Sequence, residues 1–151
     1  MDAPTNVIDN TQSWVKNQID EYVATDGAEP RFRGGAPLVL LTYKGRTSGE
    51  WRRTCLIGAE YSGGELDGAW LLVASKGGSD DHPAWYPNLV ENPTAWLHVG
   101  ADYFAVTART ATPDEKPPLW AHMVEIFPDY AGYQVKTDRD IPVVILARIV
   151  D

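Results

Sequence analysis

The residues with the clearest chemical pattern lie between Trp70 and Asn88. Four apolar residues, 71–74, end at Ser75 and Lys76, and two glycines follow. This order is typical of a buried strand that opens into a loop with exposed backbone N–H groups. Pro83 suits the first turn of a helix, because the N–H that proline lacks has no partner there. We therefore predict that a strand end, a cationic loop and a helix start converge on one anionic ligand.

A second group of candidate binding residues is basic. Residues 30–56 hold six lysines and arginines against one acid, a local net charge of +5, and the rest of this chain of net charge −8 therefore carries −13. Such focusing favours an anionic ligand, although chance placement of solvated strand ends is the alternative. Arg46, Thr47 and Ser48 occupy a turn bounded by glycines, and Arg52 and Arg53 follow it. Because strand side chains alternate, only one of these two arginines can face the ligand of the turn.

Trp85, Tyr86 and Asn88 add aromatic rings and an amide to the same region. An anionic tail joined to a planar aromatic head, as in a flavin-like nucleotide, fits these parts. The sequence has no glycine-rich nucleotide motif and no hydrolase motif, and its three histidines lack metal-ligand spacing, so we predict no metal site.

Composition excludes several classes of partner. The acidic net charge argues against nucleic acid, and no apolar run approaches the ~18 residues that a membrane span needs. The only cysteine, Cys55, rules out an internal disulfide and indicates a reducing, cytoplasmic location. We expect its thiol to be a small, inert core group.

The elements that must position these residues are short. At 151 residues the chain suits one core, with an N-terminal arm and helix over 1–30 and a barrel domain over 31–151. We predict a mainly β (α+β) fold, a six-stranded antiparallel barrel, closed or half-closed, with helices packed on it, since closure removes exposed edges. The predicted strands are 38–43, 51–61, 69–74, 94–99, 103–109 and 142–150. The predicted helices are 11–24, 84–91, 113–127 and a short piece at 130–133, and residues 1–9 are expected to be disordered.

Five motifs in this order resemble the deazaflavin (coenzyme F-420)-dependent nitroreductase family. They are Gly-Arg-Thr-Ser-Gly-x-x-Arg at 45–52, Ala-Ser-Lys-Gly-Gly at 74–78, Pro-Ala-Trp-Tyr-x-Asn-Leu at 83–89, Asn-Pro at 92–93 and Tyr-x-x-Tyr-Gln-x-x-Thr-Asp-Arg-x-Ile-Pro-Val at 130–143. The resemblance implies a split β-barrel like that of flavin-binding pyridoxamine-phosphate oxidases. It also implies hydride transfer from reduced coenzyme F-420 to quinones, activated alkenes or nitroaromatics.

The resemblance further implies which residues bind the cofactor. They are Arg46, Thr47, Ser48, Arg52, Arg53, Thr54, Cys55, Leu56, Ile57, Val73, Ala74, Ser75, Lys76, Ala84, Trp85, Tyr86, Pro87, Asn88 and Tyr130. Ser75, Tyr130 and Tyr133 are the candidate catalytic residues, which donate hydrogen bonds or a proton to the acceptor, with solvent as the alternative proton source.

Three residues depart from the family pattern. Thr47 replaces a common lysine, Trp51 replaces a common proline, and Phe127 stands where the nitroimidazole-reducing member has tyrosine. Activity on nitroimidazoles is therefore not expected.

We predict an F-420-dependent reductase with a small-molecule hydride acceptor as its partner. An FMN-dependent split-barrel oxidoreductase and a non-catalytic deazaflavin-binding protein are the alternatives, because a fold alone does not set a function. FMN is the less expected cofactor, since its single phosphate needs fewer cations than the basic region offers. Membrane association is not expected, and a homodimer is left open.

Overall fold

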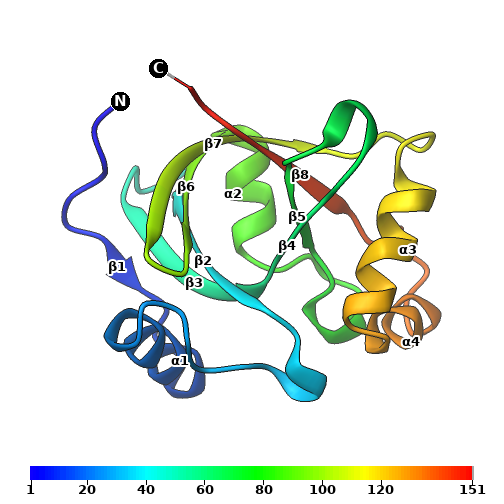
Figure 1. Ribbon diagram of the computed structural model, residues 1–151, viewed down its shortest axis with the longest axis horizontal. Helices are drawn as coiled ribbons and strands as arrows, with labels where there is room; N and C mark the ends of the chain where they lie inside the picture. The colour runs from blue at the N-terminus through cyan, green and yellow to red at the C-terminus, as the bar shows by residue number, and fades with distance from the viewer. Residues whose placement is uncertain (151) are drawn as a thin grey trace.

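Short apolar runs separated by glycine turns build one curved sheet. The computed structural model describes residues 1–150. Its strands are β1 (Ile8–Asp9), β2 (Leu38–Lys44), β3 (Trp51–Ile57), β4 (Ala59–Glu60), β5 (Trp70–Val73), β6 (Thr94–Val99), β7 (Asp102–Thr110) and β8 (Val143–Arg148). They form a single eight-stranded sheet in the order β1-β3-β2-β6-β7-β8-β5-β4 (Figure 1).

The α+β class is confirmed, but the predicted barrel of six antiparallel strands is wrong in its details. All six predicted strands are present, and two further strands extend the sheet to eight. Within residues 1–150, β1 and β4 are the two edge strands and do not pair with each other, so the sheet is not closed. The pairing of β1 with β3 is parallel, whereas the other pairs are antiparallel.

Each additional strand has a local cause. Gly58 divides the predicted strand 51–61: β3 pairs with β2, and β4 crosses to pair with β5. A side chain at Gly58 would come within 2.6 Å of Val39, so the chain turns at the residue that allows this close approach. The expectation that residues 1–9 are disordered is also wrong, because Ile8 and Asp9 pair with Arg52 and Arg53.

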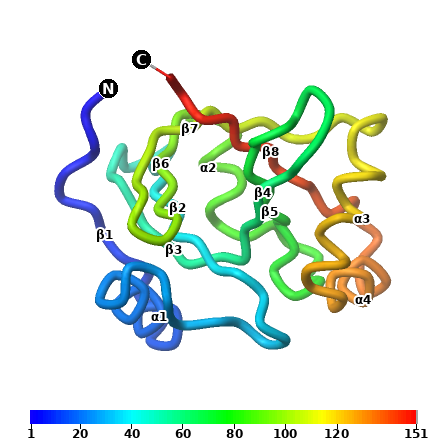
Figure 2. The backbone as a smooth tube through the Cα atoms, viewed as in Figure 1, coloured from blue at the N-terminus to red at the C-terminus, as the bar shows by residue number. Residues whose placement is uncertain are grey.

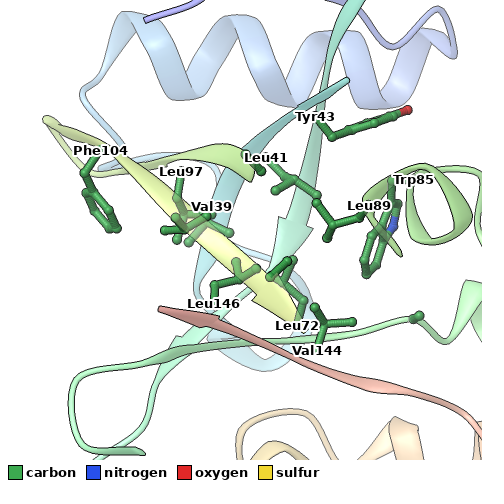
Figure 3. Packing of buried hydrophobic residues seen from close by; sticks show 14 residues of the cluster. Val39, Leu41, Tyr43, Leu72, Trp85, Leu89, Leu97, Phe104, Val144 and Leu146 are labelled. Atoms are coloured by element: carbon green, nitrogen blue, oxygen red, sulfur yellow. The ribbon is translucent and has the colours of Figure 1, made fainter. Parts of the chain in front are cut away.

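In the described part of the chain, four α-helices cover the sheet, namely α1 (Ser13–Ala24), α2 (Trp85–Glu91), α3 (Lys116–Ile126) and α4 (Asp129–Val135). α2 lies in the hollow of the curved sheet (Figure 1). Its Trp85 and Leu89 pack in the main core with Leu41, Leu72 and Val144 (Figure 3). Burial of this inner face stabilises the helix that carries the predicted aromatic residues.

The remaining helices pack on the outer face of the sheet. Val15 and Ile19 of α1 form a second core with Leu40 and Cys55. The tube in Figure 2 shows the chain running from α1 past the α3–α4 corner into β2. α3 begins at Lys116 rather than at the expected 113, with two prolines in its first turn as expected. No helix among the described residues is both long and apolar enough to cross a membrane.

Candidate functional site

The loop that follows β5 has the conformation of an anion-binding turn. Ser75 is in the right-handed helical region, while Lys76, Gly77 and Gly78 have φ of 45°, 63° and 86°. A right-handed residue followed by left-handed ones turns successive N–H groups toward one concave side, which suits negative charge. Lys76 holds this conformation without the freedom of glycine, so the loop stores backbone strain at the predicted site.

Arg139 holds this loop through hydrogen bonds to its backbone. Its guanidinium donates to the carbonyl oxygens of Ala74 at 3.1 Å, Ser75 at 2.8 Å and Ser79 at 2.7 Å. It also lies 3.1 Å from Nδ1 of His82. Because guanidinium nitrogens only donate, Nδ1 of His82 is the acceptor and the ring is neutral. Burial, and then the charge of Arg139, lower the pKa of His82.

Further contacts join the loop to α4. Thr137 donates to a carboxylate oxygen of Asp80 at 2.7 Å, and Gln134 donates to the carbonyl of Arg139 at 2.8 Å. A side chain at Gly78 would come within 2.7 Å of the carbonyl oxygen of Tyr133. The loop and the tyrosine-bearing helix therefore form one packed unit.

A cavity of about 340 Å³ lies between the glycine-bounded turn and α2. Its lining residues are Gly45, Arg46, Thr47, Ser48, Arg52, Ala84, Pro87 and Asn88. The side chain of Asn88 accepts from the N–H of Arg46 at 2.8 Å and donates to the carbonyl of Ala84 at 2.8 Å. Asn88 thus docks the turn onto the helix. Arg52 also donates to a carboxylate oxygen of Glu50 at 3.4 Å, so an anion bound here competes with that exposed ion pair.

Arg53 points away from this cavity. It donates two hydrogen bonds to Asp9 at 2.6 and 3.0 Å, and Lys16 donates a third at 3.1 Å. Burial would raise the pKa of Asp9, but the hydrogen bonds and charges of Arg53 and Lys16 outweigh it and hold that pKa below its usual value. The expectation that one of the two adjacent arginines faces the turn is confirmed, and Arg52 is that residue.

A larger cavity of about 700 Å³ opens beside the central loop. The predicted site residues in its wall are Thr54, Cys55, Leu56, Ile57, Val73, Ser75, Lys76, Ala84, Trp85, Tyr130 and Tyr133. Residues 54–57 of β3 all line this cavity, although successive side chains of a strand point to opposite faces of the sheet. The cavity therefore borders the edge of β3 rather than one of its faces. In residues 1–150, β1 pairs only with Arg52 and Arg53, and this edge has no strand partner beyond them.

Besides Arg53, two predicted residues lie outside both cavities. Ala74 is fully buried in the main core. The hydroxyl of Tyr86 lies 2.7 Å from that of Thr110, and its ring packs on His82. With Arg53, these are the predicted residues that the structure does not bring to the cavities.

Sequence reasoning missed one wall of the larger cavity. That wall consists of Asn10, Gln12, Trp14, Val15 and Gln18, together with Phe32, Leu38 and Tyr43. Phe127, which the family resemblance had singled out, also lines this cavity. The amphipathic pattern of residues 11–24 indicated only which face of the helix is buried. No motif within that segment indicates that the helix borders a cavity. Arg139 lies within one of the family motifs but was not assigned a role. The available signal was its charge, which stands close to the buried strand β8.

Titration behaviour limits the chemistry of this cavity. Burial raises the pKa of the Cys55 thiol to about 12, so it stays protonated near neutral pH. Burial, and then the neighbouring Tyr133, raise the pKa of Tyr130 well above that of free tyrosine. Tyr130 is therefore a hydrogen-bond donor rather than a base. No group of three or more His, Cys, Asp or Glu side chains among the described residues is arranged to hold a metal ion.

The two cavities share Ala84 and differ in character. One is small and cationic, and the other is large, with aromatic walls and an open strand edge. This arrangement suits an anionic tail joined to a planar ring, with space beside the ring for a second molecule.

Comparisons with known proteins agree with this geometry. Residues 14–148 match the model of a family described as F420H(2)-dependent quinone reductase. A protein of that name from Mycobacterium tuberculosis is 39% identical over 124 residues, with 78% of each chain covered. The solved F420-H2 dependent reductase FDR-A is 41% identical, with a TM-score of 0.66 over 73% of this chain and 93% of that one. A domain-swapped dimer is 38% identical, with a TM-score of 0.67 over 91% and 99%.

Proposed function

This chain belongs to the F420H(2)-dependent quinone reductase family, and we propose that its two joined cavities form the binding site for the cofactor and the acceptor. The chain transfers a hydride from reduced coenzyme F-420 to a quinone-like acceptor. The observation that carries the proposed site is that a cationic cavity and a large aromatic one lie side by side and share Ala84 in their walls.

The residues present fit this cofactor. Arg46, which is exposed, and Arg52, which is half-buried, lie beside the smaller cavity, and cationic groups of this kind bind phosphate and carboxylate groups. The open edge of β3 offers backbone donors and acceptors to a planar ring system. Trp85 and Val73 supply apolar surface around it. Lys76 lies in the wall of the larger cavity and adds a cation there.

When bound, reduced coenzyme F-420 supplies the hydride. The chain contributes placement: β3, the central loop and α2 would hold one ring, while Phe127 and the tyrosines of α4 would hold the acceptor against it. Ser75 and the N–H groups of Lys76 and Gly77 are proposed to stabilise negative charge that develops on the acceptor. Tyr130 and Tyr133 are proposed to donate hydrogen bonds to it.

The range of acceptors is part of the proposal. Quinones are the acceptors named for the family, and we extend them to activated alkenes and nitroaromatics. Phe127 lies in the cavity wall without a hydroxyl, which supports the expectation that nitroimidazoles are poor substrates. Neither FMN dependence nor a non-catalytic role is favoured, because the matched family and relatives are named for F420H(2)-dependent reduction.

The oligomeric state, the location and the division of the chain are further parts of the proposal, and each has one supporting observation. A homodimer is supported by the 38% identical relative that is a domain-swapped dimer, and a cytoplasmic location by the single free thiol of Cys55. We retain the division into an arm and helix, 1–30, and a split-barrel domain, 31–151, with Asp151 outside the described residues. Because α1 lines the larger cavity, both parts contribute to one site.

The test is a titration of the purified protein with F-420 and with FMN, followed by mixing of the reduced F-420 complex with menadione. We expect tighter binding of F-420 and rapid oxidation of the complex. Arg46→Ala should weaken F-420 binding ~10- to 100-fold by loss of one charge-assisted hydrogen bond. Arg148→Ala is the matched control, because Arg148 pairs with Asp102 and lines neither cavity. Tighter binding of FMN, or a reduced complex that menadione does not oxidise, would contradict the proposal.

A further inference from the structure

Arg33 was not part of the predicted site, yet it contacts the hydroxyl of a proposed catalytic residue. Its Nη2 donates to the oxygen of Tyr133 at 3.1 Å, across 100 positions of sequence. The same nitrogen lies 3.3 Å from a carboxylate oxygen of Asp129, in the first turn of α4. The guanidinium, carried by a loop before β2, therefore contacts a residue that lines the larger cavity.

The loop that carries Arg33 is fixed in place before any ligand binds. Its turn closes through a hydrogen bond from the N–H of Gly35 to the carbonyl of Phe32 at 2.9 Å. The ring of Phe32 packs edge-on against that of Phe127 at 5.4 Å. The guanidinium carbon lies 5.2 and 5.7 Å from these two ring centres, within the range of cation–π contact. Aromatic packing thus holds Arg33 beside α4.

The chemistry of the two groups sets the direction of the hydroxyl proton. A guanidinium only donates, so the oxygen of Tyr133 accepts from Arg33, and its own O–H must point elsewhere. Tyr133 lines the larger cavity together with Phe127 and Tyr130. The carbonyl oxygen of an acceptor placed there gains negative charge as the hydride arrives. A hydroxyl aimed at that oxygen, with a cation behind it, binds the charged state better than the neutral one.

We propose that Arg33 is a positioning residue of the acceptor site, which orients the Tyr133 hydroxyl toward the carbonyl oxygen of a quinone-like acceptor and strengthens that hydrogen bond as charge develops. The inference rests on the proposed function. Tyr133 keeps its proton throughout. The acceptor gains two electrons and a hydrogen nucleus with the hydride, and its oxygen takes the second proton from solvent.

The competing explanation is that Arg33 only tethers its loop to α4 through Asp129. A double-mutant cycle separates the two explanations. Arg33→Gln should lower kcat/KM for menadione about threefold to tenfold, a modest factor because the Arg33 side chain is 67% exposed. In a Tyr133→Phe background the same change should cost less than about twofold, and Arg33→Lys should restore part of the activity. The Kd of F-420 should stay unchanged in every variant. Asp129→Asn, which removes the ion pair alone, should leave kcat/KM within about twofold of wild type.

A second measurement needs no cofactor. Quenching of tryptophan fluorescence reports binding of neutral menadione and of the 2-hydroxy-1,4-naphthoquinone anion, which imitates the charged acceptor. Arg33→Gln should weaken binding of the anion about threefold to tenfold and that of menadione less than twofold. Equal weakening of both probes, or additive losses in the cycle, would overturn the role of Arg33. A wild-type protein that fails to bind F-420 or to reduce menadione would instead overturn the proposed function.

Discussion

Removal of the Arg139 side chain should loosen the attachment of the central loop to the rest of the protein. Its guanidinium donates to three carbonyl oxygens, and two of them belong to Ala74 and Ser75, which are 0% and 8% exposed. A hydrogen bond from a charged group contributes about 1.5–3 kcal/mol, so three bonds set an upper value of about 5–9 kcal/mol. Arg139 is itself only half-buried, and water can replace part of this. We therefore expect Arg139→Ala to lower the free energy of unfolding by about 3–5 kcal/mol.

Urea denaturation at pH 7 measures this loss as a shift of the midpoint at constant slope. Arg139→Lys should recover less than half of the loss, because one ammonium cannot reach three divergent carbonyls. Arg148→Ala is the control: its ion pair with Asp102 has both side chains more than half exposed, and its loss should cost under about 1 kcal/mol. Any folded Arg139→Lys protein should also bind F-420 more weakly, because its loop is less ordered. A loss below about 1 kcal/mol for Arg139→Ala, or full recovery by lysine, would refute the reasoning.

Substitutions at three further positions test other parts of the structure. Asp9→Asn should lower stability by about 1–2 kcal/mol at pH 7. Folding lowers the pKa of Asp9, which lies beside Arg53. The contribution of this carboxylate to the free energy of unfolding is therefore complete above the unfolded pKa of about 3.9 and is lost as pH falls through the folded pKa. The urea midpoints of wild type and variant should accordingly converge in acid. Lys76→Gly should raise the urea midpoint by removing the strain of a φ of 45°, yet weaken F-420 binding about tenfold in titrations. Lys76→Ala should weaken it equally without the gain in stability. Gly78→Ala should cost about 2–4 kcal/mol in thermal unfolding, because its φ is 86° and its Cβ would lie 2.7 Å from the carbonyl of Tyr133.

The main strands were predictable because apolar residues recur in each of them and glycine or proline lies close to at least one of its ends. β1 was not, because two residues carry no periodicity. Its position depends on Asp9, whose partner Arg53 lies 44 positions later in the chain. Gly58 could be recognised as an interruption, but the change of partner from β2 to β5 depends on packing against Val39, which no local pattern reveals.

The candidate site divides in the same way. Residues within compact motifs, such as Arg46 and Ser75, lie where the motifs suggested. Arg33 and Arg139 were missed because their partners are separated from them by 100 and by 60 to 65 positions. Their roles depend on tertiary contacts: Arg33 meets α4, and Arg139 meets the loop after β5.

The unpaired edge of β3 over residues 54–57 also bears on the solubility of the protein. A strand edge of this length would allow a second chain to extend the sheet, and such contacts seed aggregation. Here β1 pairs with the two residues that precede this edge, Arg52 and Arg53, and α1 borders the cavity beside the edge itself. Damage to the N-terminal arm would therefore convert a ligand-binding surface into a template for intermolecular strand pairing. A ring bound along this edge would protect the chain against that outcome.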